Sequence, residues 1–138
     1  MNSGSEQIIN MKCGTIDISQ LKTPPEKSEF ETARYFAERG KNIVFIRPSS
    51  IPYQHSPDIL MDGIEWEIKC PKGKSKRTIE NNMRKALSQS SFVIFDLRYI
   101  RLSEKPCITQ LKAQFYSRSK LNRLLIIKKN NELIELKK

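Results

Sequence analysis

The 138-residue sequence predicts a single α/β domain, with a mixed central β-sheet flanked by helices. Three observations support this fold class. The length allows one hydrophobic core and is too short for two ordinary domains. Short apolar segments typical of strands alternate along the chain with segments whose apolar residues recur at helical spacing. The expected order is helix, three strands, helix and strand, followed by a further helix and a C-terminal hairpin.

The folded domain is expected over residues 28–138, preceded by a flexible arm over residues 1–27. The arm contains the polar stretches MNSGSEQ and KTPPEKS, which offer little apolar surface to bury. The sequence shows no signal-peptide pattern and no apolar run of the ~18 residues that a membrane-spanning helix needs. Its three cysteines are far apart and lack the close pairs of a zinc site, which indicates reduced thiols in a reducing compartment.

The first element is predicted to be a helix over residues 28–39. Its apolar residues recur at helical spacing, and Gly40 stands where the helix is expected to end. Glu29 falls in register with Ala33 and Phe36, so an acidic residue joins an otherwise apolar stripe. This placement makes Glu29 a candidate site residue.

Residues 42–48, NIVFIRP, are predicted to form a short strand, because the run is apolar, partly β-branched and ended by proline. The next two strands form a hairpin within SPDILMDGIEWEIKCP, residues 56–71. Asp62-Gly63 between two alternating runs indicates a two-residue type I′ turn, which needs positive φ at both central residues. That turn predicts the pairs Met61 with Ile64, Leu60 with Glu65, Ile59 with Trp66, and Asp58 with Glu67.

The predicted register places Asp58 and Glu67 side by side on the face opposite the apolar residues. Lys69 lies two residues beyond Glu67 and therefore projects from the same face. Like charges directly opposed in a sheet are destabilising. A hard divalent cation held by oxygen ligands would explain the pairing. The alternative is the solvated face of a half-exposed hairpin, which is what alternating polar residues usually mean.

After the hairpin, the polar run KGKSKR leads into a second amphipathic helix, with Ser75 or Thr78 available as its N-cap. FVIFDL, residues 92–97, is typical of a strand buried on both faces. A third helix is expected to end near Ser119, and RLLIIKK and ELIELKK form a terminal hairpin around Asn130-Asn131. The helical spacing rests on Ile79, Met83, Ala86, Leu87 and Ser90 in the second helix, and on Ile108, Leu111 and Phe115 in the third.

The net charge of +10, from 25 basic and 15 acidic residues, favours a polyanionic partner. The charge is also clustered, because seven basic residues and one acidic residue, Glu80, lie between Lys69 and Lys85. A basic cluster of this kind is the expected electrostatic footprint of nucleic-acid binding. The alternative is that the charge serves solubility alone.

Pro57-Asp58 followed by Glu67-Ile68-Lys69 resembles the PD-(D/E)XK signature of metal-dependent nucleases, in its PD…ExK form. The predicted order αβββαβ is similar to the restriction-endonuclease-like core of that superfamily. Over about residues 28–136, the sequence resembles the C-terminal toxin domain of contact-dependent growth inhibition (CdiA) proteins, many of which are tRNA nucleases, and related domains at the ends of phage head proteins. The wider pattern consists of Glu29, Ala33, Gly40, Trp66, Ile79, Met83, Ala86, Gln89 and the VIFD strand.

The resemblance implies that Asp58, Glu67 and the Ile68 carbonyl hold one or two Mg²⁺ or similar ions, with Mn²⁺ and Zn²⁺ as alternatives. Lys69 would orient the attacking water and offset charge at the phosphate, while the metal lowers the pKa of that water. Glu29 would reach the metal through a water molecule.

Glu31 competes with Glu29 for this last role. Its helical neighbours are expected on the solvated side, which argues against it. These neighbours are Arg34, Tyr35 and Glu38.

The resemblance also implies residues that bind nucleic acid. Basic side chains just after Lys69 would contact backbone phosphates, which positions a substrate without reading its sequence. For each of them a solvated loop is the alternative. Gln89 would either hydrogen-bond near the site or end a packed helix. The basic residues are Lys72, Lys74, Lys76 and Arg77.

The implied substrate is tRNA rather than DNA, and the implied protein partner is a cognate immunity protein with an acidic surface. Members of this family are usually the tail of a very long secreted protein. The toxin would act in the cytoplasm of a target bacterial cell.

Three other functions stay open at this point. His55, the sole histidine, would be the general acid or base of a metal-free ribonuclease, although no second catalytic group is obvious beside it. A DNA-directed nuclease would use the same metal and lysine chemistry. The chain would instead be a basic nucleic-acid-binding module without catalysis if its carboxylates were structural.

Overall fold

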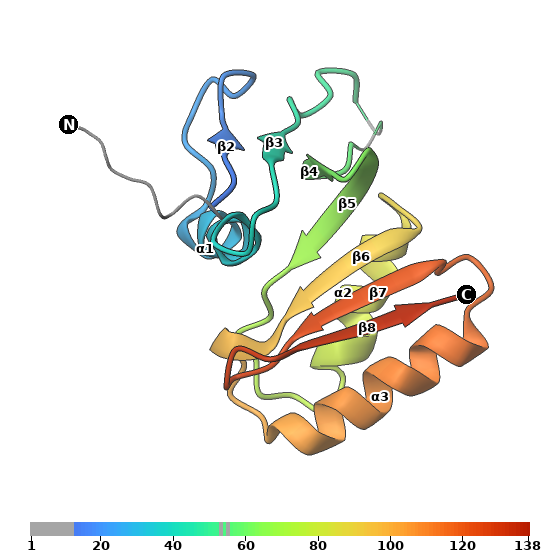
Figure 1. Cartoon of the computed structure of the whole chain (residues 1–138). Coiled ribbons are helices and arrows are strands. Elements are labelled where there is room, and N and C mark those ends of the chain that lie inside the picture. Colours follow the sequence, from blue (N-terminus) through green and yellow to red (C-terminus); the bar gives the residue numbers. More distant parts are fainter. Residues whose placement is uncertain (1–12, 53, 55) are drawn as a thin grey trace.

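Seven strands form one mixed sheet in the computed structural model, which describes residues 13–52, 54 and 56–138 (Figure 1). The strands lie side by side in chain order, and the central strand pairs antiparallel with β4 and parallel with β6. This sheet confirms the predicted fold class. The strands are β2 (Ile16–Asp17), β3 (Ile43–Phe45), β4 (Ile59–Met61), β5 (Ile64–Lys69), β6 (Phe92–Asp96), β7 (Arg123–Ile127) and β8 (Leu133–Lys137).

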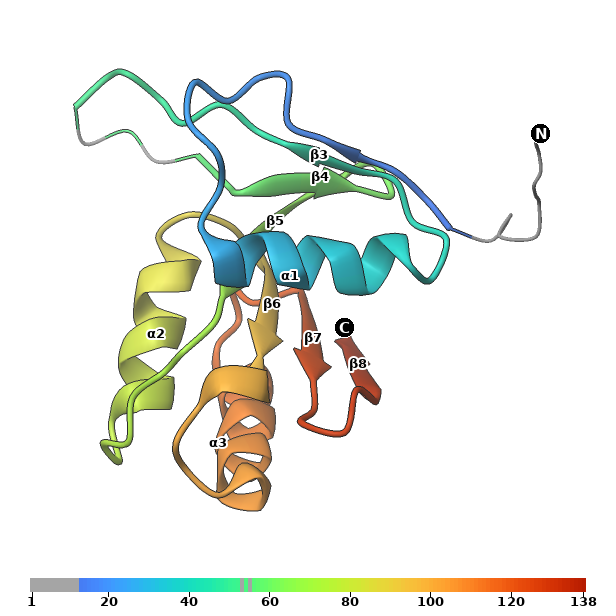
Figure 2. The ribbon, with the colours of Figure 1, turned by 90° about the vertical axis from the view of Figure 1, so that its left-hand side faces the viewer.

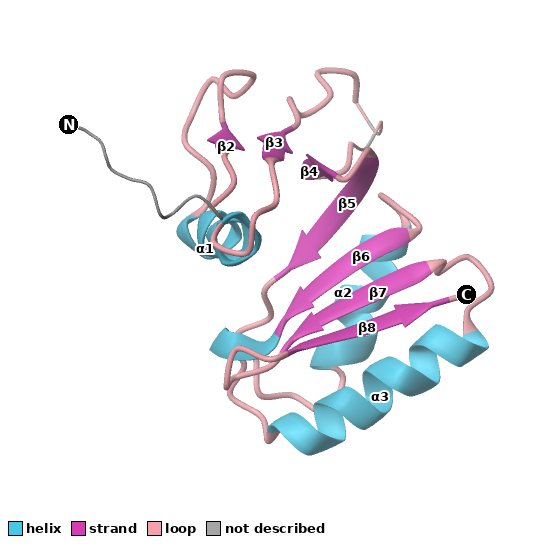
Figure 3. Ribbon diagram, viewed as in Figure 1, coloured by secondary structure: helices cyan, strands magenta, loops and turns pink. Residues whose placement is uncertain are grey.

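Helices cover both faces of the sheet (Figures 2 and 3). They are α1 (Lys27–Ala37), α2 (Thr78–Leu87) and α3 (Glu104–Ser117), with a short 3₁₀ helix, η2 (Leu97–Tyr99). One buried cluster joins α1 to the sheet through residues such as Phe36 and Trp66. A second joins α2 and α3 to the opposite face through residues such as Met83 and Phe95. No helix in the described part of the chain is long and apolar enough to cross a membrane.

Two helix ends test the predicted signals. Gly40 adopts φ 91°, and the Lys41 N–H donates to the Phe36 carbonyl at 3.1 Å, so Gly40 marks the end of the first helix as predicted. The helix itself ends at Ala37, two residues before the predicted end. The predicted N-cap of α2 is wrong. Arg77 occupies the cap position, and its side chain makes no capping hydrogen bond. The Ser75 hydroxyl instead accepts from the Arg77 N–H at 3.2 Å, within the loop that precedes the helix.

The hairpin register is as predicted over β4 and β5. Asp62 and Gly63 both have positive φ, at 56° and 74°. The observed pairs are Ile59 with Trp66, Leu60 with Glu65, and Met61 with Ile64.

The folded part begins before residue 28, which corrects the predicted boundary of the arm. Ile16 and Asp17 pair in parallel with β3 and extend the sheet by one strand. Just before β2, Gly14 permits a close approach to Lys41, because a Cβ at this position would lie 1.7 Å from the Lys41 carbonyl oxygen. The sequence pattern missed this strand because it is two residues long and is held by backbone groups, which polarity does not reveal.

Candidate active site

The predicted metal ligands and Lys69 lie at one edge of the sheet, where β5 ends. Since β5, β6 and β7 are parallel, their carboxyl ends meet at this edge, and the antiparallel β4 begins there. Asp58 directly precedes β4, while Glu67 and Lys69 lie near the end of β5. Ligands of open α/β sheets bind outside the carboxyl ends of the strands. The edge is therefore the natural place for a site.

Asp58 is placed differently from the prediction. Its N–H donates to the Trp66 carbonyl at 2.9 Å, so it does not form the ladder pair with Glu67 that the turn predicted. On the other side of β5, Glu67 pairs with Val93 of β6. The Asp58 side chain nevertheless reaches across to β5, where Oδ2 accepts from the Ile68 N–H at 2.8 Å. The chain shifts register at Asp58 and still brings its carboxylate to the end of β5.

Glu67 is buried, with only 4% of its surface exposed. Its Oε2 lies 3.3 Å from the Lys69 Nζ. Its Oε1 is also buried and accepts no hydrogen bond from the described residues, although the protonated Glu67 carboxyl is close enough to Asp58 to form a hydrogen bond with it. This environment contradicts a solvated hairpin face for Glu67. When Glu67 is ionised, a buried carboxylate oxygen without a hydrogen bond destabilises the folded state, so a ligand bound to this oxygen would stabilise it.

The electrostatics of the site disfavour the simultaneous ionisation of Asp58 and Glu67. Burial, and then the neighbouring Asp58, raises the pKa of Glu67 to about 8. Burial also raises the pKa of Asp58. The pKa of Glu29 is raised for the same reasons, because burial and then the charge of Asp58 bring it to about 7. A bound cation would relieve this repulsion and favour the ionised forms.

Glu29 shares a pocket with the end of β5. The pocket is about 290 Å³ in volume, and Lys69 and Lys72 line it together with Glu29. Glu31, the competing residue, lies 3.6 Å from Arg34 in an ion pair on the outside of α1. The rest of the lining comprises Glu26, Ser28, Ile68, Cys70, Pro71 and Asn82.

The prediction that Tyr35 lies on the solvated side is wrong. The residue is 3% exposed, its ring packs edge-on against Phe36, and the Arg39 guanidinium lies 3.6 Å from the ring centroid. The Tyr35 hydroxyl donates to the Asn131 carbonyl at 2.7 Å, which gives its polar end a partner inside the fold.

The donor set suits a Mg²⁺-type ion. In the described residues, no group of three or more His, Cys, Asp or Glu side chains is arranged to hold a metal. Two carboxylates remain, and Mg²⁺ commonly binds through one or two carboxylates and keeps several waters. The Ile68 carbonyl points the same way as its N–H, toward Asp58, because both groups of a strand residue face one neighbour. Zn²⁺ prefers nitrogen and sulfur ligands, so the site fits it less well.

The predicted nucleic-acid-binding residues are not all brought together. Lys72 lines the site pocket, but Lys74 and Lys76 are exposed in the loop beyond it. Arg77 pairs with Glu80 at 3.2 Å. Gln89 lies with Asp58 in a neighbouring pocket of about 250 Å³. His55 lies outside the described residues.

A buried polar cluster that the sequence analysis missed fixes α1 to the sheet. Asp96, at the end of β6, is fully buried. Its Oδ2 accepts from the Thr32 hydroxyl at 2.6 Å and from Arg98 Nη2 at 2.8 Å, while Oδ1 accepts from Arg98 Nε at 2.9 Å. Thr32 lies one helical turn from Glu29, so the cluster holds the acidic end of α1 in place. An aspartate ending an apolar strand was the available signal.

Glu26 is a second residue that the sequence analysis missed. It lines the pocket beside Glu29, and its charge contributes to the raised pKa of both Glu29 and Asp58. It precedes the predicted helix, and no periodic pattern includes it.

Comparison with known proteins identifies the family. Residues 55–133, more than half of the chain, match the contact-dependent growth inhibition CdiA C-terminal domain. The chain belongs to this family. Membership implies a toxin of contact-dependent growth inhibition. No curated protein matches the chain.

The fold of this CdiA C-terminal domain is similar to a solved structure described as the CdiA-CT/CdiI toxin and immunity complex from Burkholderia pseudomallei. The TM-score is 0.64, and the match covers 91% of this chain and 100% of the other. Sequence identity is 18%, so the likeness shows a shared fold.

Proposed function

We propose that this CdiA C-terminal domain is a metal-dependent endonuclease with a PD-(D/E)XK-type site that cleaves RNA, and tRNA in preference to DNA. The observation that supports it best is the buried Glu67 carboxylate, whose Oε1 accepts no hydrogen bond from the described residues and which lies beside Asp58 and Lys69. Carboxyl groups whose pKa values are raised by burial, close to one another and to a lysine, are typical of functional sites.

Each residue has a separate role in the proposed hydrolysis. Asp58, Glu67 and the Ile68 carbonyl would hold a divalent cation, which lowers the pKa of bound water and neutralises charge on the phosphate. Lys69 places a positive charge next to Glu67 and would orient the attacking water. The water oxygen forms the new bond to phosphorus, and the bond from phosphorus to the leaving oxygen breaks. The water gives up one proton, and the leaving oxygen takes up another.

The substrate and the partner follow from charge and family. The net charge of +10 and Lys72 at the pocket favour a polyanion. The preference for tRNA follows from the resemblance to contact-dependent inhibition toxins, because phosphate contacts carry no base identity. The similar structure is titled as a toxin and immunity complex, so we extend to this chain an immunity protein with an acidic surface. The domain would act in the cytoplasm of a target bacterial cell.

Incubation with end-labelled tRNA and with duplex DNA, in Mg²⁺ and again in excess chelator, tests this function. We expect cleavage of tRNA in Mg²⁺, slower cleavage of DNA, and none in chelator. Cleavage that continues in chelator would contradict a metal-dependent site and favour the alternative based on His55. Binding of tRNA without cleavage in Mg²⁺, Mn²⁺ or Zn²⁺ would instead support a non-catalytic binding module.

A further inference from the structure

A second pocket lies between α2 and α3, and does not share a residue with the site pocket. It is about 460 Å³ in volume, and the described residues that line it include no acidic side chain. Three of them are basic and three are serines, which are the side chains that donate hydrogen bonds to phosphate oxygens. The lining comprises Arg84, Leu87, Ser88, Ser117, Arg118, Ser119 and Lys120.

The basic residues of this pocket carry uncompensated charge. Within the described part of the chain, Arg84, Arg118 and Lys120 take part in no ion pair. Their polar contacts are to neutral groups, since Arg84 donates to the Asn81 amide oxygen and Arg118 to the Gln114 amide oxygen. The positive charges therefore remain available to an anion.

The helix dipoles explain only some of the basic residues at this pocket. Both α2 and α3 end here, and a cation near a helix C-terminus is stabilising by about 0.3–1 kcal/mol. That effect falls off within the last turn, so it does not explain Lys120, three residues beyond α3. The pocket therefore contains more basic side chains than stabilisation of the two helix C-termini explains.

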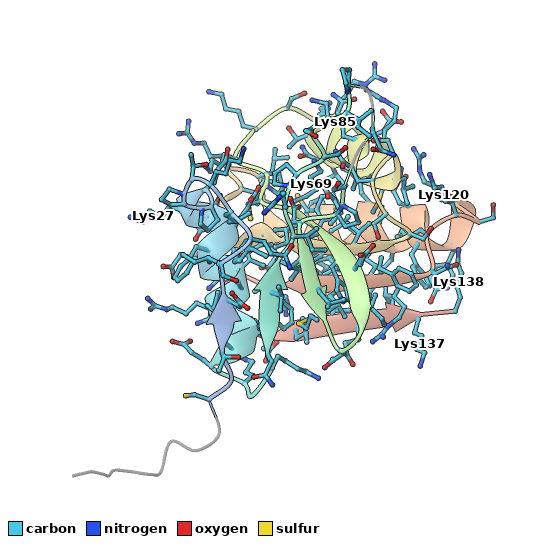
Figure 4. All side chains as sticks on the ribbon, turned by 90° about the horizontal axis from the view of Figure 1, so that it is seen from above. Lys27, Lys69, Lys85, Lys120, Lys137 and Lys138 are labelled. Carbon is cyan, nitrogen blue, oxygen red and sulfur yellow. The ribbon has the colours of Figure 1, made fainter. Side chains whose placement is uncertain are left out.

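The pocket is placed to receive another part of a polymer that enters the site. Asn82 lines the site pocket on one flank of α2, and Arg84 lines the second pocket on the opposite flank. A polynucleotide that engages both must cross the outer surface of α2, about 10–12 Å wide. Lys85 is exposed in the same helix, and in Figure 4 Lys69 lies between Lys27 and Lys120.

We propose that Arg84, Arg118 and Lys120 form a second phosphate-binding site, which holds the substrate backbone on the far side of α2 from the scissile bond. This inference rests on the proposed nuclease function. The ligand is the phosphodiester backbone of a structured polynucleotide.

The test is tRNA affinity as a function of salt, measured in a Glu67→Gln background and in chelator so that no cleavage occurs. The variant is Arg84→Gln with Lys120→Gln, two exposed positions. The control is Lys105→Gln with Lys112→Gln, which removes the same charge from exposed positions on α3. We expect the variant to bind unfractionated bacterial tRNA about tenfold more weakly near 0.15 M salt. Its log–log salt slope should fall by about 1.4–1.8, which corresponds to two lost phosphate contacts. The control should stay within about twofold, and both should keep the parental melting temperature.

Four results would overturn this inference, and the last of them would also overturn the proposed function. Equal losses in variant and control would mean that only net charge matters. Unchanged tRNA affinity with weaker binding of poly-glutamate would assign the pocket to an acidic protein partner. Unchanged affinity for both, while the wild-type chain cleaves tRNA in Mg²⁺, would remove the second site and leave the proposed function intact. A wild-type chain that binds no tRNA at all would contradict both proposals.

Discussion

At the scale of single residues, the two oxygens of Glu67 have different surroundings. Oε2 has the Lys69 ammonium at 3.3 Å, whereas Oε1 is buried and accepts no hydrogen bond in the described part of the molecule. In the metal-free chain this carboxyl is easier to bury protonated than ionised. Removing a proton therefore costs the folded state free energy unless a cation is bound.

The pH dependence of stability follows from the raised pKa of Glu67. The pKa is about 8 in the folded chain against an ordinary value of 4.5, so the stabilisation is complete below pH 4.5 and is lost as the pH rises through 8. In chelator, we expect Glu67→Gln to gain about 1–2 kcal/mol of unfolding free energy relative to wild type between pH 5 and pH 9. Urea denaturation at the two pH values measures this. Glu135→Gln, at an exposed strand position, should show no such gain. A Glu67→Gln difference that does not change with pH would contradict the assignment.

Substitutions of Lys69 and Lys72 are expected to have different effects on cleavage rate and on tRNA affinity. Lys69→Met should lower the single-turnover cleavage rate about 100-fold, because it removes charge stabilisation at the reacting phosphate. Its tRNA affinity should change by less than about threefold. Lys72→Met should weaken tRNA binding and lower the salt slope by about 0.7–0.9, with the saturated rate nearly unchanged. Equal effects of the two variants on rate and affinity would show that Lys69 acts only as another phosphate contact.

At the scale of elements, the site depends on how α1 is attached to the sheet. The Thr32, Asp96 and Arg98 cluster provides that attachment, and Arg98 Nη2 also donates to the Glu31 carbonyl of α1 at 3.2 Å. Two separate elements therefore supply the carboxylates of the site: Glu29 comes from α1, while Asp58 and Glu67 come from the hairpin. The position of Glu29 relative to Asp58 and Glu67 therefore depends on the stability of this cluster.

Asp96→Asn tests this attachment. The substitution leaves the Arg98 guanidinium without its charge partner in a buried setting, where breaking a pair costs about 3–5 kcal/mol. We expect a loss of about 3 kcal/mol in the free energy of unfolding by urea. Asp62→Asn is the matched control, because it removes an ion pair with Lys41 of the same 2.8 Å length at exposed positions. Its cost should stay below about 1 kcal/mol. Similar losses in both would mean that the buried cluster contributes little.

The elements also show what the sequence was able to predict. Local chemistry determined the hairpin, since Asp62-Gly63 demands a turn with positive φ and the alternating run demands one register. The buried β6 strand was predictable for the same reason, because its apolar run has no exposed face. The burial of Glu67 was not predictable from the hairpin alone, because it depends on the pairing of β5 with β6. The Asp96 and Arg98 contact to Thr32 depends on how two distant elements pack.

At the scale of the whole molecule, the sheet separates two different environments. One face packs on α1, and the other packs on α2 and α3. The acidic site lies at the carboxyl edge of β5, in a chain whose net charge is +10. A polyanion is attracted by the net positive charge, while Asp58 and Glu67 lie together where a cation would be needed. This separation of charge fits a nuclease better than a uniformly basic binding module.

Single-turnover cleavage of end-labelled tRNA in Mg²⁺, by the wild-type chain and by Glu67→Gln and Glu135→Gln, tests the central claim most directly. We predict that wild type and Glu135→Gln cleave at the same rate, and that Glu67→Gln is at least about 10³-fold slower while it still binds tRNA. Cleavage by Glu67→Gln at the wild-type rate would contradict the assignment of Asp58, Glu67 and Lys69 as the active site.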